Sequence, residues 1–254
     1  MNIVNFSVLV FALSLLALWL AAQTGSYFGG RRRNLEEAER EDLGVILAAA
    51  LTLLGLTIGF SFSMAVNRYD QRKQYEAEEA NAIGTEYVRA GLLRTGDATK
   101  VRELLRSYLD QRISFYTKHD TRQLEQINTS TAQLQDHLWS AVQAAAGAQP
   151  TPVVALAVSG MNDVLNSQGY TEAAWRNRIP IAAWGLMVAV AICCNLLIGY
   201  NSRRIEKKSR RYFILPLIVS IAFFLIAEMD TPGGGLIRVL PQNLVSLFRS
   251  LRVP

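Results

Sequence analysis

The fold is decided by residues 44–72, which read GVILAAALTLLGLTIGFSFSMAVNRYDQR. The first part, residues 44–66, contains no Asp, Glu, His, Lys or Arg. A helix needs about 20 apolar residues to cross the roughly 30 Å hydrocarbon layer of a membrane. Polar sequence follows at once, without a proline to stop the helix. We therefore expect a membrane-spanning helix that continues into a polar domain.

Three further stretches are long and apolar enough to cross a membrane. They comprise residues 3–22, 179–200 and 212–227, which also lack Asp, Glu, His, Lys and Arg. A cleaved signal peptide is the alternative for the first stretch. However, no Lys or Arg precedes Arg31, and the apolar run exceeds the roughly 7–15 residues typical of such a signal. We predict an all-α integral membrane protein with four transmembrane helices.

Between spans two and three the sequence predicts a helical extramembrane domain. Val101, Leu105 and Tyr108 recur at three- and four-residue spacing, which is typical of an amphipathic helix. Thr151 before Pro152 predicts a capped helix start. We divide the chain into a transmembrane hairpin (1–66), the helical domain (67–178), a second hairpin (179–227) and a C-terminal tail (228–254). In the tail, apolar residues beside Arg249 and Arg252 predict a short interfacial helix.

The distribution of charge excludes some partners. Half of the residues are hydrophobic, which excludes a disordered chain, and the two cysteines are adjacent, which excludes a disulfide scaffold. The net charge of +5 lies in residues 201–211, which hold six basic residues and one acidic residue. The central domain has thirteen of each sign, so we expect no nucleic-acid partner. Ten Lys and Arg on one side of the membrane oppose eight on the other, so charge leaves the orientation open.

The sequence contains no arrangement that predicts catalysis. His119 and His137 lack metal-ligand spacing, and the glycines at 233–235 lack the Lys and Ser/Thr of a phosphate-binding loop. The run of Glu76, Glu78 and Glu79 is typical of a solvated helix face, with a cation site as the alternative. We expect no catalytic residue, no metal and no cofactor, and hence no enzyme. The uncharged spans also argue against a proton-coupled transporter, whereas a pore can be lined by hydroxyl and apolar groups.

The second span carries the candidate functional residues. Thr52, Leu56 and Phe60 are four residues apart and share one helix face, which in a ring of subunits would line a narrow neck. The candidate pore-lining residues are Thr52, Leu56, Phe60 and Ser63. Gly55 and Gly59 form a GxxxG pair that favours close helix packing, which is the alternative role for this span.

Three segments carry a resemblance to a known family. The segment FSFSMAVNRYDQR (60–72) resembles the end of the pore helix of bestrophins, where a Phe closes a hydrophobic neck. Together with EEANAIGTEYVRA (78–90) and MDTPGGGLIRV (229–239), it is similar to the bacterial bestrophin-like domain family. The family-motif residues are Arg68, Tyr69, Arg72, Glu79 and Asn81.

Bestrophins are pentameric anion channels with four spans and a helical cytosolic domain. The resemblance therefore implies a homo-oligomeric ion channel of a bacterial inner membrane, in contact with lipid, that conducts chloride or another anion. It also implies that the domain is cytoplasmic and continues the pore. The acidic cluster with which animal bestrophins sense calcium has no counterpart here, so calcium gating is not implied. Thr52 stands where an apolar neck residue is expected. The alternative is a membrane-anchored sensor or scaffold that presents its helical bundle to a ligand or partner.

Overall fold

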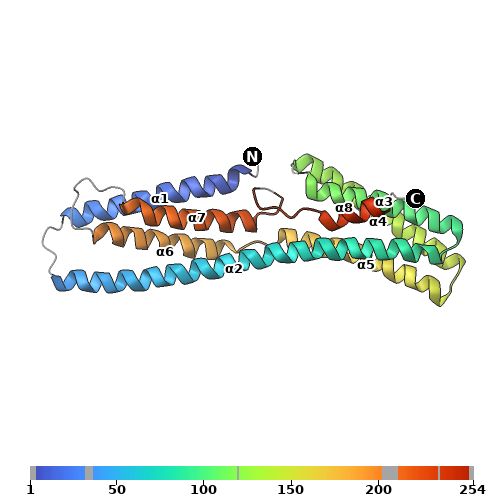
Figure 1. Ribbon diagram of the computed structural model, residues 1–254, viewed down its shortest axis with the longest axis horizontal. Helices are drawn as coiled ribbons and strands as arrows, with labels where there is room; N and C mark the ends of the chain where they lie inside the picture. Colours follow the sequence, from blue (N-terminus) through green and yellow to red (C-terminus); the bar gives the residue numbers. More distant parts are fainter. Residues whose placement is uncertain (1–3, 32–36, 119, 202–210, 234, 252–254) are drawn as a thin grey trace. The chain divides into compact units, whose positions relative to one another are not determined.

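The computed structural model describes residues 4–31, 37–118, 120–201, 211–233 and 235–251. Within these residues the chain is helical and contains no strand (Figure 1). The elements are α1 (Val4–Arg31), α2 (Glu37–Arg89), η1 (Ala90–Leu92), α3 (Thr95–Thr117), α4 (Thr121–Ala148), α5 (Pro152–Arg176), α6 (Ile181–Tyr200), α7 (Arg211–Asp230) and α8 (Gln242–Ser250). His119 and residues 202–210 of the basic loop lie outside the described residues.

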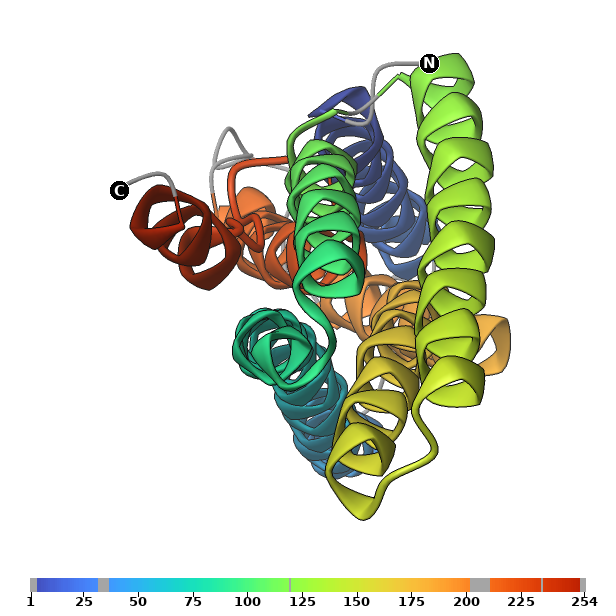
Figure 2. The same ribbon diagram turned by 90° about the vertical axis from the view of Figure 1, so that its right-hand side faces the viewer.

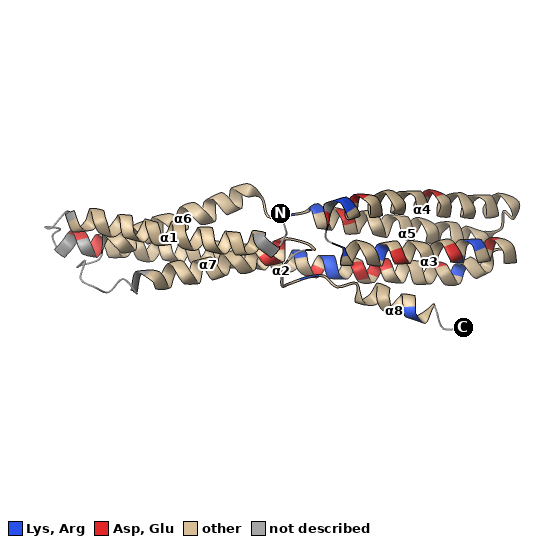
Figure 3. Cartoon of the chain, turned by 90° about the horizontal axis from the view of Figure 1, so that it is seen from above, with Lys and Arg blue, Asp and Glu red and all other residues tan. Residues whose placement is uncertain are grey.

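Four segments are long and apolar enough to cross a membrane. They lie within Phe6–Gly30, Glu41–Leu92, Pro152–Tyr200 and Phe213–Asp230. Figure 3 shows that Lys, Arg, Asp and Glu are sparse along α1, α6 and α7 and frequent on α3 and on the second half of α2. The predicted class, an all-α membrane protein with four spans, is confirmed.

The chain folds as two compact units. Unit 1 comprises Met1–Arg68 and Arg178–Ile237, and unit 2 comprises Tyr69–Asn177 and Arg238–Pro254. Helix α2 is uninterrupted and contributes its first part to unit 1 and its second part to unit 2. Because no proline or cap stops α2 after residue 66, the backbone hydrogen bonds of the apolar segment continue into the polar one.

In unit 1, α1 packs closely against α6 because glycines remove side chains from the contact. A Cβ atom on Gly199 would overlap the carbonyl oxygen of Ala22, and one on Gly25 would overlap that of Leu196. The two backbones therefore approach to a distance that only glycine allows, as in other small-residue membrane interfaces. Beside this contact, Leu18 of α1 and Phe223 of α7 are buried in the core of unit 1.

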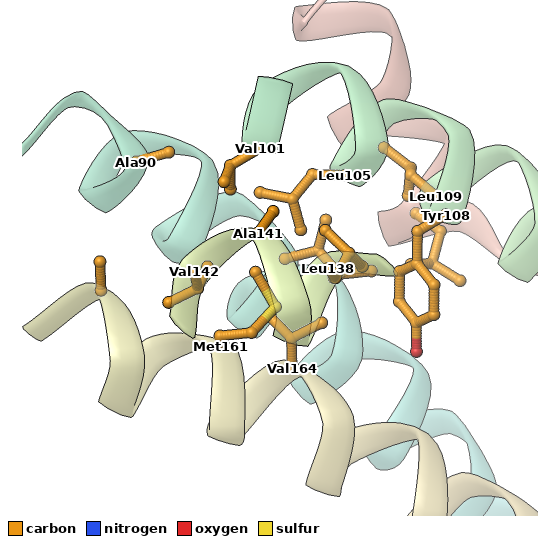
Figure 4. Close-up of a cluster of buried hydrophobic side chains, with 14 of the residues drawn as sticks. Ala90, Val101, Leu105, Tyr108, Leu109, Leu138, Ala141, Val142, Met161 and Val164 are labelled. Atoms are coloured by element: carbon orange, nitrogen blue, oxygen red, sulfur yellow. The ribbon is translucent and has the colours of Figure 1, made fainter. Parts of the chain in front are cut away.

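In unit 2, the helices α3, α4 and α5 and the second part of α2 enclose an apolar core (Figures 2 and 4). Val101, Leu105 and Tyr108 of α3 are fully buried, as their spacing predicted. Leu138 of α4 and Met161 of α5 meet them in this core. Burial of each such side chain contributes roughly 1.5–3 kcal/mol to folding.

Two helices of unit 2 have identifiable terminal contacts. The Thr151 hydroxyl accepts a hydrogen bond from the Val154 amide at 3.2 Å, with Pro152 in the first turn of α5, which confirms the predicted helix start. At the C-terminus of α4, the Arg94 guanidinium donates to the carbonyl of Ala148 at 3.0 Å. A cation at a helix C-terminus satisfies a carbonyl that lacks an intrahelical partner and opposes the helix dipole.

Helix α8 packs against the other helices of unit 2. Leu244 is fully buried, and Leu247 lies against Gly84 of α2. The apolar side of the helix thus contacts protein, while contact of α8 with lipid remains a prediction. Figure 2 shows α8 beside α3.

The glycine contact in unit 1 yields a testable prediction. We expect Gly199→Ala to lower the stability of unit 1 by about 1–3 kcal/mol, the usual cost of overpacking. Gly185 lies on the same helix with open space around its Cα, so Gly185→Ala is the matched control and should be neutral or slightly stabilising. Thermal unfolding of the detergent-solubilised protein measures both. Equal melting temperatures for the two variants would contradict the predicted close contact.

Candidate functional site

The candidate pore-lining residues lie on an exposed face of α2. Leu56 and Phe60 have 54% and 71% of their surface exposed, and Thr52 and Ser63 are exposed as well. The Thr52 hydroxyl donates to the Ala48 carbonyl at 2.9 Å, which satisfies it within its own helix. An exposed apolar patch on a membrane-spanning helix usually marks a contact surface. This face therefore borders lipid, another chain or the interior of a pore.

The contact of α2 with the rest of unit 1 is confined to the opposite side of the helix. Leu54, Ser61 and Ala65 are buried there, at helical spacing. Gly55 and Gly59 lie at the edge of the exposed face, and a Cβ atom on either would meet no atom within 4 Å. No described helix of the same chain packs against this glycine pair. Helix packing at Gly55 and Gly59 stays a prediction, and it requires a second chain.

The motif residue Arg68 connects the end of the apolar segment to the third sequence motif. Its guanidinium lies 3.4 Å from the carboxylate of Asp230, at the end of α7. Asp230 also accepts a hydrogen bond from the Ile179 amide at 2.9 Å, just before α6 begins. Two segments 162 residues apart are thereby joined in unit 1. In unit 2, the hydroxyl of Tyr69 donates to the carbonyl of Arg238 at 3.4 Å.

Arg72 and Glu76 are buried on α2 and each contacts the end of another helix. The Arg72 guanidinium donates to the carbonyls of Ala174 and Asn177 at 3.1 and 3.0 Å, at the C-terminus of α5. The Glu76 carboxylate accepts hydrogen bonds from the amides of Asn243 and Leu244 at 2.9 and 3.0 Å, at the N-terminus of α8. Each charge has the sign that stabilises the helix end it meets.

Helix α8 is held at its other end too. The Arg106 guanidinium of α3 donates to the Leu251 carbonyl at 3.0 Å and to the Tyr87 hydroxyl at 2.7 Å. Glu76 at its N-terminus and Arg106 at its C-terminus thus stabilise α8, a helix that is too short to be stable alone. Helix α8 is therefore an integral part of unit 2.

Glu79 forms the most enclosed ion pair of the molecule's described part. Its carboxylate and the Arg112 guanidinium of α3 are both completely buried and hydrogen-bonded. Tyr116 and Thr171 also donate to Glu79, at 3.4 and 3.2 Å. Burial, together with the charge of Glu79, raises the pKa of the Tyr116 hydroxyl above its usual range, so the hydroxyl remains a donor. Loss of one partner from a buried pair of this kind costs about 3–5 kcal/mol.

The chain matches the model of the Bestrophin-like domain family over residues 8–244. It belongs to the Bestrophin-like domain family. Among curated proteins none matches. The fold is also that of a bacterial Bestrophin homolog from Klebsiella pneumoniae. One variant of that homolog is 13% identical with a TM-score of 0.64 over 99% of this chain and 97% of its own. A second structure of the homolog, solved by Zn-SAD phasing, is 14% identical with a TM-score of 0.60 over 95% and 98% of the two chains.

In this Bestrophin-like chain the run of glutamates is not a single solvated face. Glu76 and Glu79 are buried and bonded as described, and only Glu78 is exposed. The prediction of a solvated face was therefore wrong for two of the three residues. Consecutive residues point in different directions on a helix, so adjacent acids separate into a buried and an exposed set. The motif residue Asn81 is exposed, on the same side as Glu78.

Glu86, in the second motif, is a buried acid that sequence analysis did not single out. Its side chain is fully buried between α2 and α5, and neither carboxyl oxygen has a hydrogen-bond partner. A Cβ atom on Gly160 of α5 would overlap the carboxyl group, so glycine makes room for it. Removal from water raises the pKa of Glu86 from 4.5 to about 8, an effect that Arg89 opposes and Asp163 reinforces. The group is therefore mostly protonated at neutral pH.

The protonation of Glu86 predicts how the stability of unit 2 depends on pH. Between about pH 4.5 and 8 the folded state retains a proton that the unfolded chain releases. The free energy of unfolding should therefore fall as the pH rises through this window. Glu86→Gln should reduce the slope of unfolding free energy against pH by an amount that corresponds to at most about one bound proton. Denaturant unfolding from pH 5 to pH 9 measures the slope. Glu125→Gln is the control, because Glu125 is an exposed acid of α4 and is not among the charges that shift the pKa of Glu86. An unchanged slope in Glu86→Gln would contradict the assignment.

Proposed function

We propose that the protein is a homo-oligomeric ion channel whose pore is lined by α2. The observation that carries this proposal is the exposed face of α2, on which Leu56 and Phe60 project away from the side that holds the buried Leu54, Ser61 and Ala65. An apolar constriction between hydroxyl-bearing turns is a known form of channel gate. Membership of the Bestrophin-like family supports a channel rather than an enzyme.

The glycine pair supports an arrangement of several chains around an axis. Gly55 and Gly59 flank the exposed face and leave open space beside the backbone. In a closed ring, each α2 presents one face to the axis and an adjacent edge to its neighbour. Small residues at that edge allow neighbouring helices to approach closely. A pentamer in a bacterial inner membrane, surrounded by lipid, is the assembly that the resemblance to bestrophins implies.

The charge of the permeant ion is a separate part of the proposal. The resemblance to bestrophins implies chloride or another anion, and the prediction of chloride rests on that resemblance alone. The neck residues themselves are uncharged, so Thr52, Leu56, Phe60 and Ser63 limit the size and hydration of an ion without selecting its sign.

The neck is tested with purified protein in liposomes. We expect Phe60→Ala to raise ion flux severalfold, because the substitution removes the largest apolar side chain from the constriction. Phe62→Ala is the matched control. Phe62 is also exposed but lies two residues on, away from the neck face, so its removal should leave flux unchanged. Both variants should retain the oligomeric state of the wild type in size-exclusion chromatography.

Two results would contradict the proposal in different ways. Equal flux from wild type and Phe60→Ala, in a working channel, would remove Phe60 from the neck. No flux from any folded, oligomeric variant would contradict channel activity and favour a sensor or scaffold that presents the helices of unit 2 to a ligand or partner.

A further inference from the structure

The carboxyl group of Glu86 lies in a part of unit 2 that is suited to a neutral acid. Its side chain is fully buried between α2 and α5, and among the described residues neither oxygen has a hydrogen-bond partner. An ionised carboxylate is costly at such a place unless a positive charge joins it, whereas a protonated carboxyl is tolerated. A change in the charge of Glu86 therefore requires a change in its surroundings.

The guanidinium of Arg89 lies beside Glu86 but is paired with another acid. Arg89 follows Glu86 by three residues on α2, so the two side chains are neighbours on one helix face. Both reach the place where Gly160 of α5 has no side chain. A Cβ atom there would overlap Oε2 of Glu86 and would lie 2.7 Å from Nη1 of Arg89. The same Nη1 lies 3.7 Å from the carboxylate of Asp163, about one turn further along α5.

The pair of Arg89 with Asp163 is readily exchanged. The two side chains are 34% and 62% exposed, and an ion pair this accessible to water contributes little to stability. A pair of Arg89 with an ionised Glu86 would be shielded from water, where opposite charges attract each other more strongly. The charge of Glu86 therefore decides which acid binds Arg89.

Few other charges act on Glu86. Arg89 on its own helix and Asp163 on α5 are the charged groups that influence it. From α3, Arg102 is bound to the carbonyl of Tyr87 at 3.1 Å, and α4 faces the core of unit 2 with apolar side chains. Burial raises the pKa of Glu86 from 4.5 to about 8, so its charge changes just above neutral pH.

We propose that Glu86, Arg89 and Asp163 form a pH-sensitive switch in which Arg89 exchanges its partner. At neutral and lower pH, Glu86 is protonated and Arg89 binds Asp163. At alkaline pH, Glu86 releases its proton to the solvent, Arg89 turns into the space beside Gly160 and binds the new carboxylate, and Asp163 is left to the solvent. The switch lies wholly within unit 2 and does not depend on the proposed channel function.

The exchange is tested by determining the structure of the full chain at about pH 6 and at about pH 9, on either side of the pKa of Glu86. Arg89 should contact Asp163 at the lower pH and Glu86 at the higher pH. Glu86→Gln cannot ionise, so Arg89 should contact Asp163 at both. Arg89 bound to Asp163 at both pH values in the wild type would overturn the inference.

Infrared difference spectroscopy measures the titration itself, because a protonated carboxyl group loses its carbonyl band when it ionises. The wild type should lose one such band near pH 8. Asp163→Asn removes the competing acid and should shift the loss to lower pH, whereas Arg89→Gln removes the counter-charge and should shift it to higher pH. Glu125→Gln removes an exposed acid of α4 and should cause no shift.

The variants of Arg89 and Asp163 keep the test valid even where Glu86→Gln does not fold. Both side chains are partly exposed, so their substitution should leave unit 2 folded. The absence of a titrating carboxyl group in the wild type would overturn the inference. A titration at the same pH in wild type, Asp163→Asn and Arg89→Gln would overturn it as well, because a merely structural role for Arg89 and Asp163 predicts no shift.

Discussion

The structure of unit 2 depends on the buried polar side of α2. Arg72, Glu76 and Glu79 lie on this side at helical spacing, and each binds a different part of the unit. Arg72 holds the end of α5, Glu76 the start of α8, and Glu79 the buried Arg112 of α3. A buried charge is costly unless it is paired or hydrogen-bonded. The positions of α5, α8 and α3 are therefore restricted to those in which Arg72, Glu76 and Glu79 keep their partners. The polar side of α2 thus specifies where its neighbours pack.

This division of the helix explains why its other side can remain exposed. In unit 1 the buried residues of α2 include Leu54, Ser61 and Ala65, and in unit 2 they include the buried charges, on the same side of the helix. The opposite side carries Phe60 in one unit and Glu78 in the other, and both side chains are exposed in the single chain. This exposed face is the one that the proposed assembly uses.

Much of the architecture could be predicted from the sequence because it rests on local physical chemistry. Uncharged runs of about 20 residues identify the spans, and Thr151 before Pro152 identifies the start of α5. Long-range pairing could not be predicted in this way. The burial of Glu76 and Glu79 depends on partners that lie 167 and 33 residues away in the sequence. The close contacts of Gly25 and Gly199 depend on how α1 and α6 pack against each other. A single sequence shows residue types, but it does not show which distant residue satisfies them.

The central claim is that one face of α2 borders an aqueous ion pathway. It is tested most directly by single cysteines along residues 52–66, in a chain whose Cys193 and Cys194 are replaced by Ser, with a charged thiol reagent and flux as the readout. The account predicts rapid modification and altered flux at positions 52, 56, 60 and 63, and protection at the buried positions 54, 61 and 65. Modification that shows no helical periodicity, or that occurs without any effect on flux, would contradict it.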